Sequence, residues 1–405
     1  MLSVAEAQKK VLAAVEALDP VTVLVADALG LTVAEDLRAP HPLPRFDNSA
    51  MDGYAVRAED TTGTPVELRV TGEVRAGSIS SEESLAPGTA VRIMTGAPVP
   101  EGANAIVPVE VTEESGDVVR ILESVEAGRH VRPAGDDVDT GQLVVPAGTE
   151  LGPGELALVA SLGLSPVPVR PGPRVAILVT GDELVPPEEE PGPGQIRDSN
   201  SIALRALVRE AGAEPLAMPH VPDDRAGTLD AFKWAAEDAD LVVSSGGVAV
   251  GRYDFVKEVV EELGSIDMWR VAMQPGKPVV LGSLGATPFL GLPGNPVSIH
   301  VSFEQFVRPA IRKMRGCAIL FRPTITAELT ESISKRPGRL HFVRVRLDAS
   351  GGGWTATPTG PQGSHIQSSL VGTHGVAVFE RDLDRLEAGS TVEVQVWSLP
   401  GGRSS

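Results

Sequence analysis

The chain has 405 residues, of which 42% are hydrophobic and 22% are charged, a balance typical of globular proteins. A chain of this length is too long for one hydrophobic core and should fold as roughly two to four domains. Its formal net charge of -19 argues against a general nucleic-acid or anionic-membrane binder, because such proteins need basic surfaces. We therefore expect no nucleic-acid partner and no membrane partner.

Cysteine content and the first segment bear on location. Cys317 is the single cysteine, so no intramolecular disulfide can form, and a reducing, cytoplasmic setting is predicted. The segment MLSVAEAQKKVLAAVEAL lacks the basic head and the continuous apolar block of a signal peptide. The sequence contains no run of about 18 apolar residues, so we expect a soluble protein that is not secreted.

The first third of the chain is predicted to be one helix followed by short strands. Ser3 and Glu6 form a capping-box pattern, and Asp19–Pro20 is predicted to end the helix. The apolar positions at helical spacing are Val4, Ala7, Val11, Val15 and Leu18. From about residue 57 to residue 145, β-prone runs such as VELRVTGEV, AVRIMTGAPVP, AIVPVE and VVRIL predict a small all-β unit. Residues 151–169 indicate a short helix and then a strand.

After a Pro-Gly-Pro linker at 171–173, strands and helices alternate. RVAILVTG is a continuous apolar run, as expected for a strand covered on both faces, and DLVVSSGG and PFLGLPG follow it. Three helical stripes lie between and after them: Leu204, Leu207, Val208 and Ala211; Val256, Val259, Val260 and Leu263; Ile299, Phe303, Phe306, Val307 and Ile311. The alternation predicts a doubly wound, largely parallel sheet from about 173 to 316. Beyond it, TITAEL, HFVRVRL, WTATP, GVAVFE and TVEVQVW predict a small C-terminal β-barrel or sandwich.

Three segments follow strands of the predicted sheet: TGDEL at 180–184, SSGGVAVGRYD at 244–254 and GLPGNPVS at 291–298. Ligands of open α/β sheets bind outside the carboxyl ends of the strands. Glycines in such loops let backbone N–H groups approach an anion. Each segment alone is a weak signal, but three on one sheet predict a cradle for an anionic ligand.

Several charged residues near these segments have two interpretations each. Glu183 could hold a metal ion or a ligand hydroxyl, or be a surface carboxylate. Asp254 could be the N-cap of the next helix, contact a ligand, or do both. The carboxylates of VPDD, residues 221–224, could form a Mg²⁺ site or a solvated acidic loop. Lys277, between two prolines, could be a cation aimed at a ligand or an ordinary turn lysine.

Other chemistries find no support. The seven histidines show no HExxH or comparable metal spacing, and neither a GxSxG elbow nor a Walker-type loop occurs. Hydrolase and P-loop kinase functions are therefore disfavoured. Arg344 and Arg346 alternate with apolar residues and could face solvent on a strand.

Six motifs in this order, NSAMDGYAV, MTGAPVP, TGDEL, SSGGVAVG, PGKP and GLPGNPVS, resemble the MoeA family of molybdopterin molybdenumtransferases, which includes the E domains of gephyrin and plant Cnx proteins. The resemblance covers essentially the whole chain. It implies a homodimer of multi-domain α/β plus β subunits. The implied domains are a segmented linking domain (1–24, 40–52 and 137–172), a β-rich domain (25–39 and 53–136), a molybdopterin-binding α/β domain (173–316) and a C-terminal β-barrel (317–405).

The reaction that the resemblance implies is insertion of molybdate into adenylylated molybdopterin, with release of AMP and molybdenum cofactor and with Mg²⁺ as the usual divalent cation. The site would lie between the α/β domain of one subunit and the β-rich domain of the other. Molybdenum bound by soft thiolates would normally suggest protein cysteines. With one cysteine in the chain, the pterin dithiolene must supply the sulfur. A MogA-type adenylyltransferase and molybdoenzyme maturation proteins are the implied partners.

The site residues follow from the motifs. The implied catalytic residues are Asp52, Thr95, Glu183, Asp254 and Lys277. The residues implied to bind molybdopterin are Ser245, Gly246, Gly247, Pro293, Gly294, Asn295, Pro296 and Ser298, together with Arg132, Arg339 and Ser368. The implied metal ligands are Glu183, Asp223, Asp224 and Asp254.

The chain departs from the family pattern at three positions. Ala249 replaces the serine of GGVSxG, Gln274 replaces the first lysine of KPGKP, and His341 replaces an acidic residue in a GRxEFxR-like stretch. The first two positions are associated with holding molybdate in the family. Gln274 can still donate hydrogen bonds, whereas Ala249 cannot replace a hydroxyl.

Two alternative functions compete with the insertase. One is a non-catalytic paralogue that binds molybdopterin or acts as a scaffold, but nothing in the chain resembles gephyrin's extra linker and N-terminal domain. The other is the adenylylating step of single-domain MogA-type proteins. The large β-rich and C-terminal units argue against that step.

Overall fold

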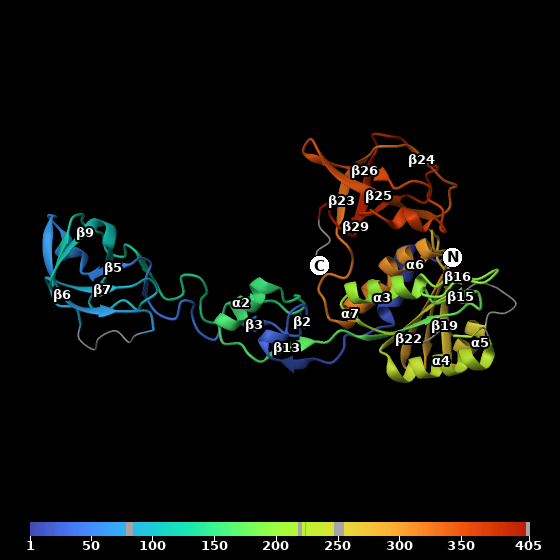
Figure 1. The fold of residues 1–405 in the computed structure, drawn as a ribbon, viewed down its shortest axis with the longest axis horizontal. Helices are drawn as coiled ribbons and strands as arrows, with labels where there is room; N and C mark the ends of the chain where they lie inside the picture. The colour runs from blue at the N-terminus through green and yellow to red at the C-terminus, as the bar shows by residue number, and fades with distance from the viewer. Residues whose placement is uncertain (78–83, 218–220, 223, 247–254, 402–405) are drawn as a thin grey trace. The chain divides into compact units, whose positions relative to one another are not determined.

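The computed structural model describes residues 1–77, 84–217, 221–222, 224–246 and 255–401 (Figure 1). Its contacts group the chain into two compact units. Unit 1 comprises Met1–Ala34, Ala147–Gly152 and Pro166–Ser405, and unit 2 comprises Glu35–Pro146 and Pro153–Ser165.

Unit 2 contains a six-stranded sheet in the order β8-β5-β7-β6-β10-β9, in which β6 and β7 form the one parallel pair. The strands are β5 (Gly53–Val56), β6 (Val66–Val74), β7 (Thr89–Ile93), β8 (Ala105–Pro108), β9 (Thr112–Ser115) and β10 (Val118–Ile121). Tyr54, Leu68 and Ile106 are among its buried side chains. The predicted β-rich unit is confirmed.

The rest of unit 2 consists of short elements. β3 (Leu37–Arg38) pairs with β12 (Leu143–Val145), and β4 (Asn48–Ser49) pairs with β11 (Val131–Arg132). The unit also has helix α2 (Pro153–Ser161) and the short turns η2 (Ala58–Thr61) and η3 (Val109–Val111). Helix α2 confirms the helix predicted from residues 151–169.

Unit 1 is built on a second six-stranded sheet, in the order β17-β14-β18-β22-β21-β19. The strands are β14 (Arg174–Val179), β17 (Glu214–Ala217), β18 (Leu241–Ser245), β19 (Gly264–Arg270), β21 (Pro278–Leu284) and β22 (Thr287–Leu292). The first four in spatial order are parallel, and β21 is antiparallel to both of its neighbours. This arrangement confirms the doubly wound, largely parallel sheet.

Helices cover both faces of this sheet (Figure 1). Alternate strand residues point to opposite faces, so Val243 belongs to one apolar core and Val242 to the other. The first core is closed by α1 (Val4–Ala13), α3 (Asn200–Glu210), α6 (Pro296–Ser302) and α7 (Arg308–Met314). The second is closed by α4 (Arg225–Asp238) and α5 (Phe255–Leu263). None of the helices in the described ranges has the length and apolar character needed to cross a membrane.

Helix α1 begins as predicted and ends earlier. Ser3 and Glu6 form the capping box, but the helix ends at Ala13 and not at Asp19–Pro20. The reason is tertiary: the Leu18 N–H donates to the Met314 carbonyl at 2.8 Å, and Arg170 donates to the Leu18 carbonyl. These contacts replace the helical bonds that the apolar spacing favoured.

Helix α4 was not among the predicted elements. Its buried positions are Thr228, Ala231, Phe232 and Ala235, and the small or polar side chains among them give a weak apolar stripe. The predicted stripe from Ile299 to Ile311 is buried as expected. It runs through α6, the π-helical turn η4 (Phe303–Val307) and α7.

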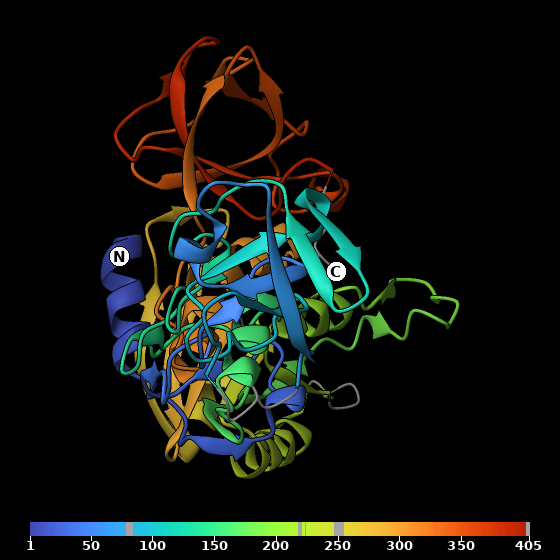
Figure 2. The same cartoon turned by 90° about the vertical axis from the view of Figure 1, so that its left-hand side faces the viewer.

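The C-terminal strands of unit 1 form a closed barrel, which Figure 2 shows in orange to red. The ring runs β25-β26-β23-β29-β27 and returns from β27 to β25, while β20 (Met273–Gln274) adds to the outside of β25. The strands are β23 (Thr324–Leu329), β25 (Leu340–Ser350), β26 (Gly353–Pro358), β27 (Gly375–Phe379) and β29 (Thr391–Val396). Of the two predicted shapes, the barrel is therefore correct.

The smaller elements of unit 1 form one three-stranded sheet, two two-stranded ladders and two turns. β13 (Val167–Arg170) lies between β1 (Val21–Val23) and β2 (Thr32–Val33). β15 (Leu184–Val185) pairs with β16 (Ile196–Arg197), and β24 (Ile333–Ser334) pairs with β28 (Arg385–Leu386). The turns are η1 (Val25–Asp27) and η5 (Gln367–Leu370).

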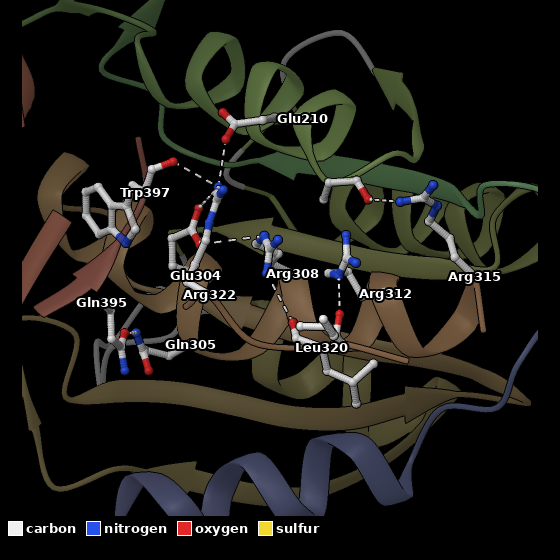
Figure 3. A network of polar contacts seen from close by, with 12 residues as sticks. Glu210, Glu304, Gln305, Arg308, Arg312, Arg315, Leu320, Arg322, Gln395 and Trp397 are labelled. Carbon is white, nitrogen blue, oxygen red and sulfur yellow. Dashed lines mark hydrogen bonds and ion pairs between the residues drawn. The ribbon is translucent and has the colours of Figure 1, made fainter. Parts of the chain in front are cut away.

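A buried polar network joins the barrel to the α/β sheet domain (Figure 3). Glu304, whose side chain is 2% exposed, accepts two hydrogen bonds from Arg322, each of 2.9 Å. Arg322 also bonds Glu210 at 2.6 Å and the Trp397 carbonyl at 3.3 Å. Gln305 donates to Gln395 of β29 at 2.6 Å. Because α3, η4 and the barrel all contribute, this network fixes the barrel's orientation on the sheet domain.

Candidate functional site

The three predicted strand-end segments meet at one edge of the sheet of unit 1. The Thr180 N–H, after β14, donates to the Ser245 carbonyl at 3.3 Å. The Gly246 N–H, after β18, donates to the Leu292 carbonyl at 3.3 Å. The carboxyl ends of β14, β18 and β22 are therefore in direct contact, as predicted for a ligand cradle.

Gly246 occupies a position that only glycine fits well. Its φ is +86°, and a Cβ there would lie 3.0 Å from the Thr180 carbonyl oxygen, a crowded approach in a conformation that other residues rarely adopt. The Gly246 Cα lies 3.9 Å from the place where a Cβ on Gly294 would stand. The loop that follows, including the predicted Gly247, Ala249 and Asp254, lies outside the described residues.

Asn200 ties two of these segments together. Its side-chain amide donates to the Gly294 carbonyl at 2.8 Å and to the Ser245 hydroxyl at 3.2 Å. Sequence analysis missed this residue, because the asparagine stands at the start of α3 and not in any strand-end motif. The signal that could have found it is its place at the start of α3, the first helix after β14, because the helix that follows a strand of such a sheet begins near the carboxyl end of that strand.

Lys277 lies at this edge as well. β21 runs antiparallel to β22 with Val280 opposite Gly291, so the start of β21, which Lys277 immediately precedes, lies at the same edge of the sheet as the carboxyl end of β22. The Lys277 carbonyl accepts from the Val271 N–H at 3.0 Å, which fixes the backbone of the turn, while the side chain is exposed. The structure therefore places a solvent-facing cation at the edge of the sheet where β22 ends.

The turn before Lys277 packs tightly against α6. Gly276 has a φ of +94°, and a Cβ there would lie 2.5 Å from the Ser302 hydroxyl and 3.2 Å from the Met273 methyl group. The predicted residue Ser298 is buried, at 3% exposure, and its carbonyl lies 3.5 Å from the same Cβ position. Glycine at 276 is thus what lets the turn approach the helix.

Gly276→Ala is expected to lower the free energy of unfolding of unit 1 by about 2–3 kcal/mol, because the new methyl group adds a clash to an unfavourable φ. Chemical denaturation followed by tryptophan fluorescence measures it, since all four tryptophans (234, 269, 354 and 397) belong to unit 1. Gly285→Ala is the control. Gly285 also has a positive φ, of +60°, but nothing lies within 4 Å of its Cβ position, so the loss should be about 1 kcal/mol. Equal losses in the two variants would contradict the clash.

The barrel brings two predicted residues to the same region. Gln274 of β20 pairs with His341 of β25, and the Leu340 N–H donates to the Ala272 carbonyl at 3.0 Å, so Arg339 lies beside the turn that carries Lys277. Ser368 is an exposed residue of η5. The loop just before η5 reaches the GLPGNP segment: the Asn295 amide donates to the Ser364 hydroxyl, and the Val297 N–H donates to the Ser364 carbonyl, both at 3.2 Å.

His341 is an unusual neighbour of this turn. It is 3% exposed, and neither of its ring nitrogens has a hydrogen-bond partner among the described residues. Burial, together with repulsion from Arg344, Lys335 and Arg339, lowers the pKa of His341 to about 4. The side chain is therefore neutral at physiological pH.

Arg344 does not face solvent, contrary to one of the predicted alternatives. The side chain is completely buried, and burial lowers its pKa to about 10. The loop that follows β26 packs over the strand and covers the Arg344 side chain. The guanidinium donates to the Ser369 hydroxyl at 2.8 Å. Arg346, two residues along, is exposed as predicted.

The predicted metal ligands are only partly described. Asp223 and Asp254 lie outside the described residues. Asp224 is the N-cap of α4 and accepts from the Gly227 N–H at 2.8 Å, while Glu183 is exposed at the strand-end segment. In the described ranges, no group of three or more His, Cys, Asp or Glu side chains could hold a metal ion.

The remaining predicted residues belong to unit 2. One oxygen of Asp52 accepts from both the N–H and the hydroxyl of Thr95, each at 2.7 Å, and these bonds lower the pKa of Asp52. Arg132 is exposed and pairs with Asn48 across β11 and β4. The NSAMDGYAV and MTGAPVP motifs are therefore joined at Asp52 and Thr95.

The doubly wound domain of this chain, with its joined strand-end loops, is of the molybdopterin-binding class. Residues 176–313 match the family model described as a probable molybdopterin binding domain. Residues 2–163 match the MoeA N-terminal region (domain I and II), and residues 326–397 match the MoeA C-terminal region (domain IV). The chain belongs to the MoeA family of molybdopterin molybdenumtransferases.

Similar proteins match along almost the whole chain. Molybdopterin molybdenumtransferase 2 of Mycobacterium tuberculosis is 43% identical over 412 residues, which cover 98% of this chain and 100% of that protein. The molybdopterin molybdenumtransferase of Haemophilus influenzae is 37% identical over 372 residues, covering 91% and 92%. The crystal structure of the molybdopterin biosynthesis MoeA protein from Pyrococcus horikoshii is similar with a TM-score of 0.83 and 30% identity, covering 98% of this chain and 100% of that chain.

Proposed function

We propose that this protein is a molybdopterin molybdenumtransferase, which inserts molybdate into adenylylated molybdopterin and releases AMP and molybdenum cofactor. The observation that carries the proposal is the joined sheet edge, where the strand-end loops, the Lys277 turn and the loop before η5 lie together. This edge offers backbone and side-chain donors and a cation to a phosphate-rich substrate and an oxyanion. The single cysteine, Cys317, is buried, so the sulfur ligands of molybdenum come from the pterin dithiolene.

The proposed roles divide between two groups of residues. Ser245, Gly246, Gly247, Pro293, Gly294, Asn295, Pro296 and Ser298 shape the molybdopterin site, with Lys277, Arg339 and Ser368 facing its anionic groups. Asp52, Thr95 and Arg132 of a second subunit complete the site in a homodimer. The bonds from Thr95 hold Asp52 as a carboxylate with one oxygen free of that residue, which suits it to position a hydroxyl or a hydrated cation.

Magnesium is part of the proposal. Carboxylate oxygens are ligands that Mg²⁺ prefers, and Glu183, Asp223, Asp224 and Asp254 would supply them. The Asp224 carboxylate already caps α4, which leaves Glu183 as the one unengaged ligand among the two that are described. When bound, the ion would neutralise phosphate charge.

The proposed setting follows from the same chemistry. The adenylylated substrate must come from an adenylyltransferase of the MogA type, and the product must pass to molybdoenzyme maturation proteins in the cytoplasm. In this proposal the subunit has four domains, one of which is a segmented linking domain. Tandem size-exclusion chromatography and light scattering would test the homodimer, since a monomeric mass would contradict a site shared by two subunits.

The reaction itself is tested by incubating the purified protein with adenylylated molybdopterin, with and without molybdate and Mg²⁺. The expected result is AMP release that depends on molybdate. Tight binding of the adenylylated substrate without molybdate-dependent AMP release would instead support the non-catalytic paralogue. The replacements at Ala249 and Gln274 make that outcome worth measuring, because they remove one hydroxyl and one charge from the family pattern.

Lys277→Met is expected to reduce kcat/KM for the adenylylated substrate about 10- to 100-fold, because it removes the cation at the sheet edge where β22 ends. Steady-state AMP release at several molybdate concentrations measures the change. The control is Lys233→Met, since Lys233 is an exposed residue of α4, a helix that covers the second core. A Lys277→Met protein as active as Lys233→Met would make Lys277 an ordinary turn lysine.

A further inference from the structure

Arg344 is the largest fully buried side chain among the described residues, and the proposed function does not use it. Its guanidinium has no carboxylate partner among the described residues: the Nε atom donates to the Ser369 hydroxyl at 2.8 Å. The Nη2 atom donates to the carbonyls of Pro361 and Gly363 at 3.2 and 3.3 Å. Burying a charge that has only neutral acceptors destabilises the folded state. We therefore expect the arginine to have a role that a neutral side chain could not fill.

All of these acceptors belong to one loop, the segment from residue 359 to residue 369. The backbone of Arg344 holds the same loop, because its N–H donates to the Gln362 side chain at 2.9 Å and its carbonyl accepts from the Thr359 N–H at 3.1 Å. The Ser369 hydroxyl in turn donates to the Ile366 carbonyl at 2.5 Å. One residue of β25 thus fixes both ends and the middle of the loop.

The loop ends on the candidate site. Ser364, between Gly363 and Ser369, accepts from the Asn295 amide and from the Val297 N–H, both at 3.2 Å. Asn295 follows Gly294, which Asn200 holds from the other side at 2.8 Å. Arg344 therefore holds the backbone on one side of Ser364, at Gly363, and Ser364 in turn bonds the GLPGNP segment. Ser368 belongs to the same loop.

We infer that Arg344 is a positioning residue for substrate binding: its fork of donors sets the 359–369 loop so that Ser364 holds Asn295, and with it the pterin-side wall of the site. Lysine could keep the charge but not the three directed bonds, because its ammonium is a point donor at the end of a flexible stem. The inference rests on the proposed function and adds to it a residue on the barrel that does not touch the substrate.

The test compares Arg344→Lys, Arg344→Met and Ser364→Ala in steady-state AMP release. Each variant is expected to raise KM for adenylylated molybdopterin about tenfold, with kcat within about twofold of the wild type, because the wall of the site is displaced while the reacting groups are kept. The double variant Arg344→Lys/Ser364→Ala should be no worse than either single change, since both break the same chain of contacts. Arg346→Met is the matched control, because Arg346 is exposed two residues along the same strand, and it should leave KM unchanged.

Two results would overturn the inference. One is a KM for Arg344→Lys and Ser364→Ala equal to that of Arg346→Met, and the other is a double variant whose effect is the product of the two single effects. Ser364→Ala and Ser369→Ala are small changes that keep the test decisive if the Arg344 variants do not fold. Failure of the proposed function is distinct, because the wild type itself would then release no AMP in response to molybdate.

Discussion

Replacing Arg322 with methionine is expected to lower the free energy of unfolding of unit 1 by about 3–5 kcal/mol, the usual loss when one partner of a buried ion pair is removed. The change leaves Glu304 charged and 2% exposed, with Arg308 3.9 Å away as its remaining cation. Burial opposes the charge of Arg322, but its bonds to Glu304 and Glu210 outweigh burial and raise its pKa. The arginine is therefore fully charged at physiological pH.

Chemical denaturation followed by tryptophan fluorescence measures this loss. The matched control is Arg225→Met, because Arg225 also has two carboxylate neighbours, Glu258 and Glu262, but is 52% exposed. Exposed pairs contribute about 1 kcal/mol or less. If the two variants lose the same stability, the network of Figure 3 is not a buried joint between barrel and sheet domain.

His341→Leu is expected to remove about 3 kcal/mol of pH dependence from the stability of unit 1. The pKa of His341 is lowered to about 4 in the folded protein, against about 6.5 in an unfolded chain. Between these values the unfolded state binds a proton that the folded state excludes. The stability that the neutral histidine gives is therefore complete above about pH 6.5 and is lost as the pH falls through 4.

The measurement is the difference in unfolding free energy between wild type and variant from pH 7.5 to pH 4, which cancels groups common to both proteins. At pH 7.5 the variant should be at least as stable as the wild type, because it removes two buried ring nitrogens that have no partner among the described residues. Towards pH 4 the wild type should lose stability relative to the variant. Parallel curves across this range would show that His341 is protonated equally in both states.

Apolar periodicity was enough to predict most of the architecture. The stripe from Val4 to Val11 and the runs RVAILVTG and VELRVTGEV became α1, β14 and β6, because an element with one strong apolar pattern buries the same face in any fold that it joins. Helix α4 escaped prediction because Ala231, Ala235 and Thr228 give little apolar contrast. The end of α1 escaped it because Leu18 is held by Met314, almost 300 residues away.

The candidate site divides in the same way. By itself the sequence determined the strand-end loops, the family pattern and the residue types that meet an anion, because glycines and charges at strand ends are local properties of short segments. Only the tertiary structure decided that Asn200 and Ser364 hold the GLPGNP loop from two sides and that Arg344 is buried. Each of these depends on contacts between segments far apart in the chain. The alternation of apolar and charged residues around Arg344 and Arg346 would be the same if that face of the strand were exposed to water and not covered by a loop.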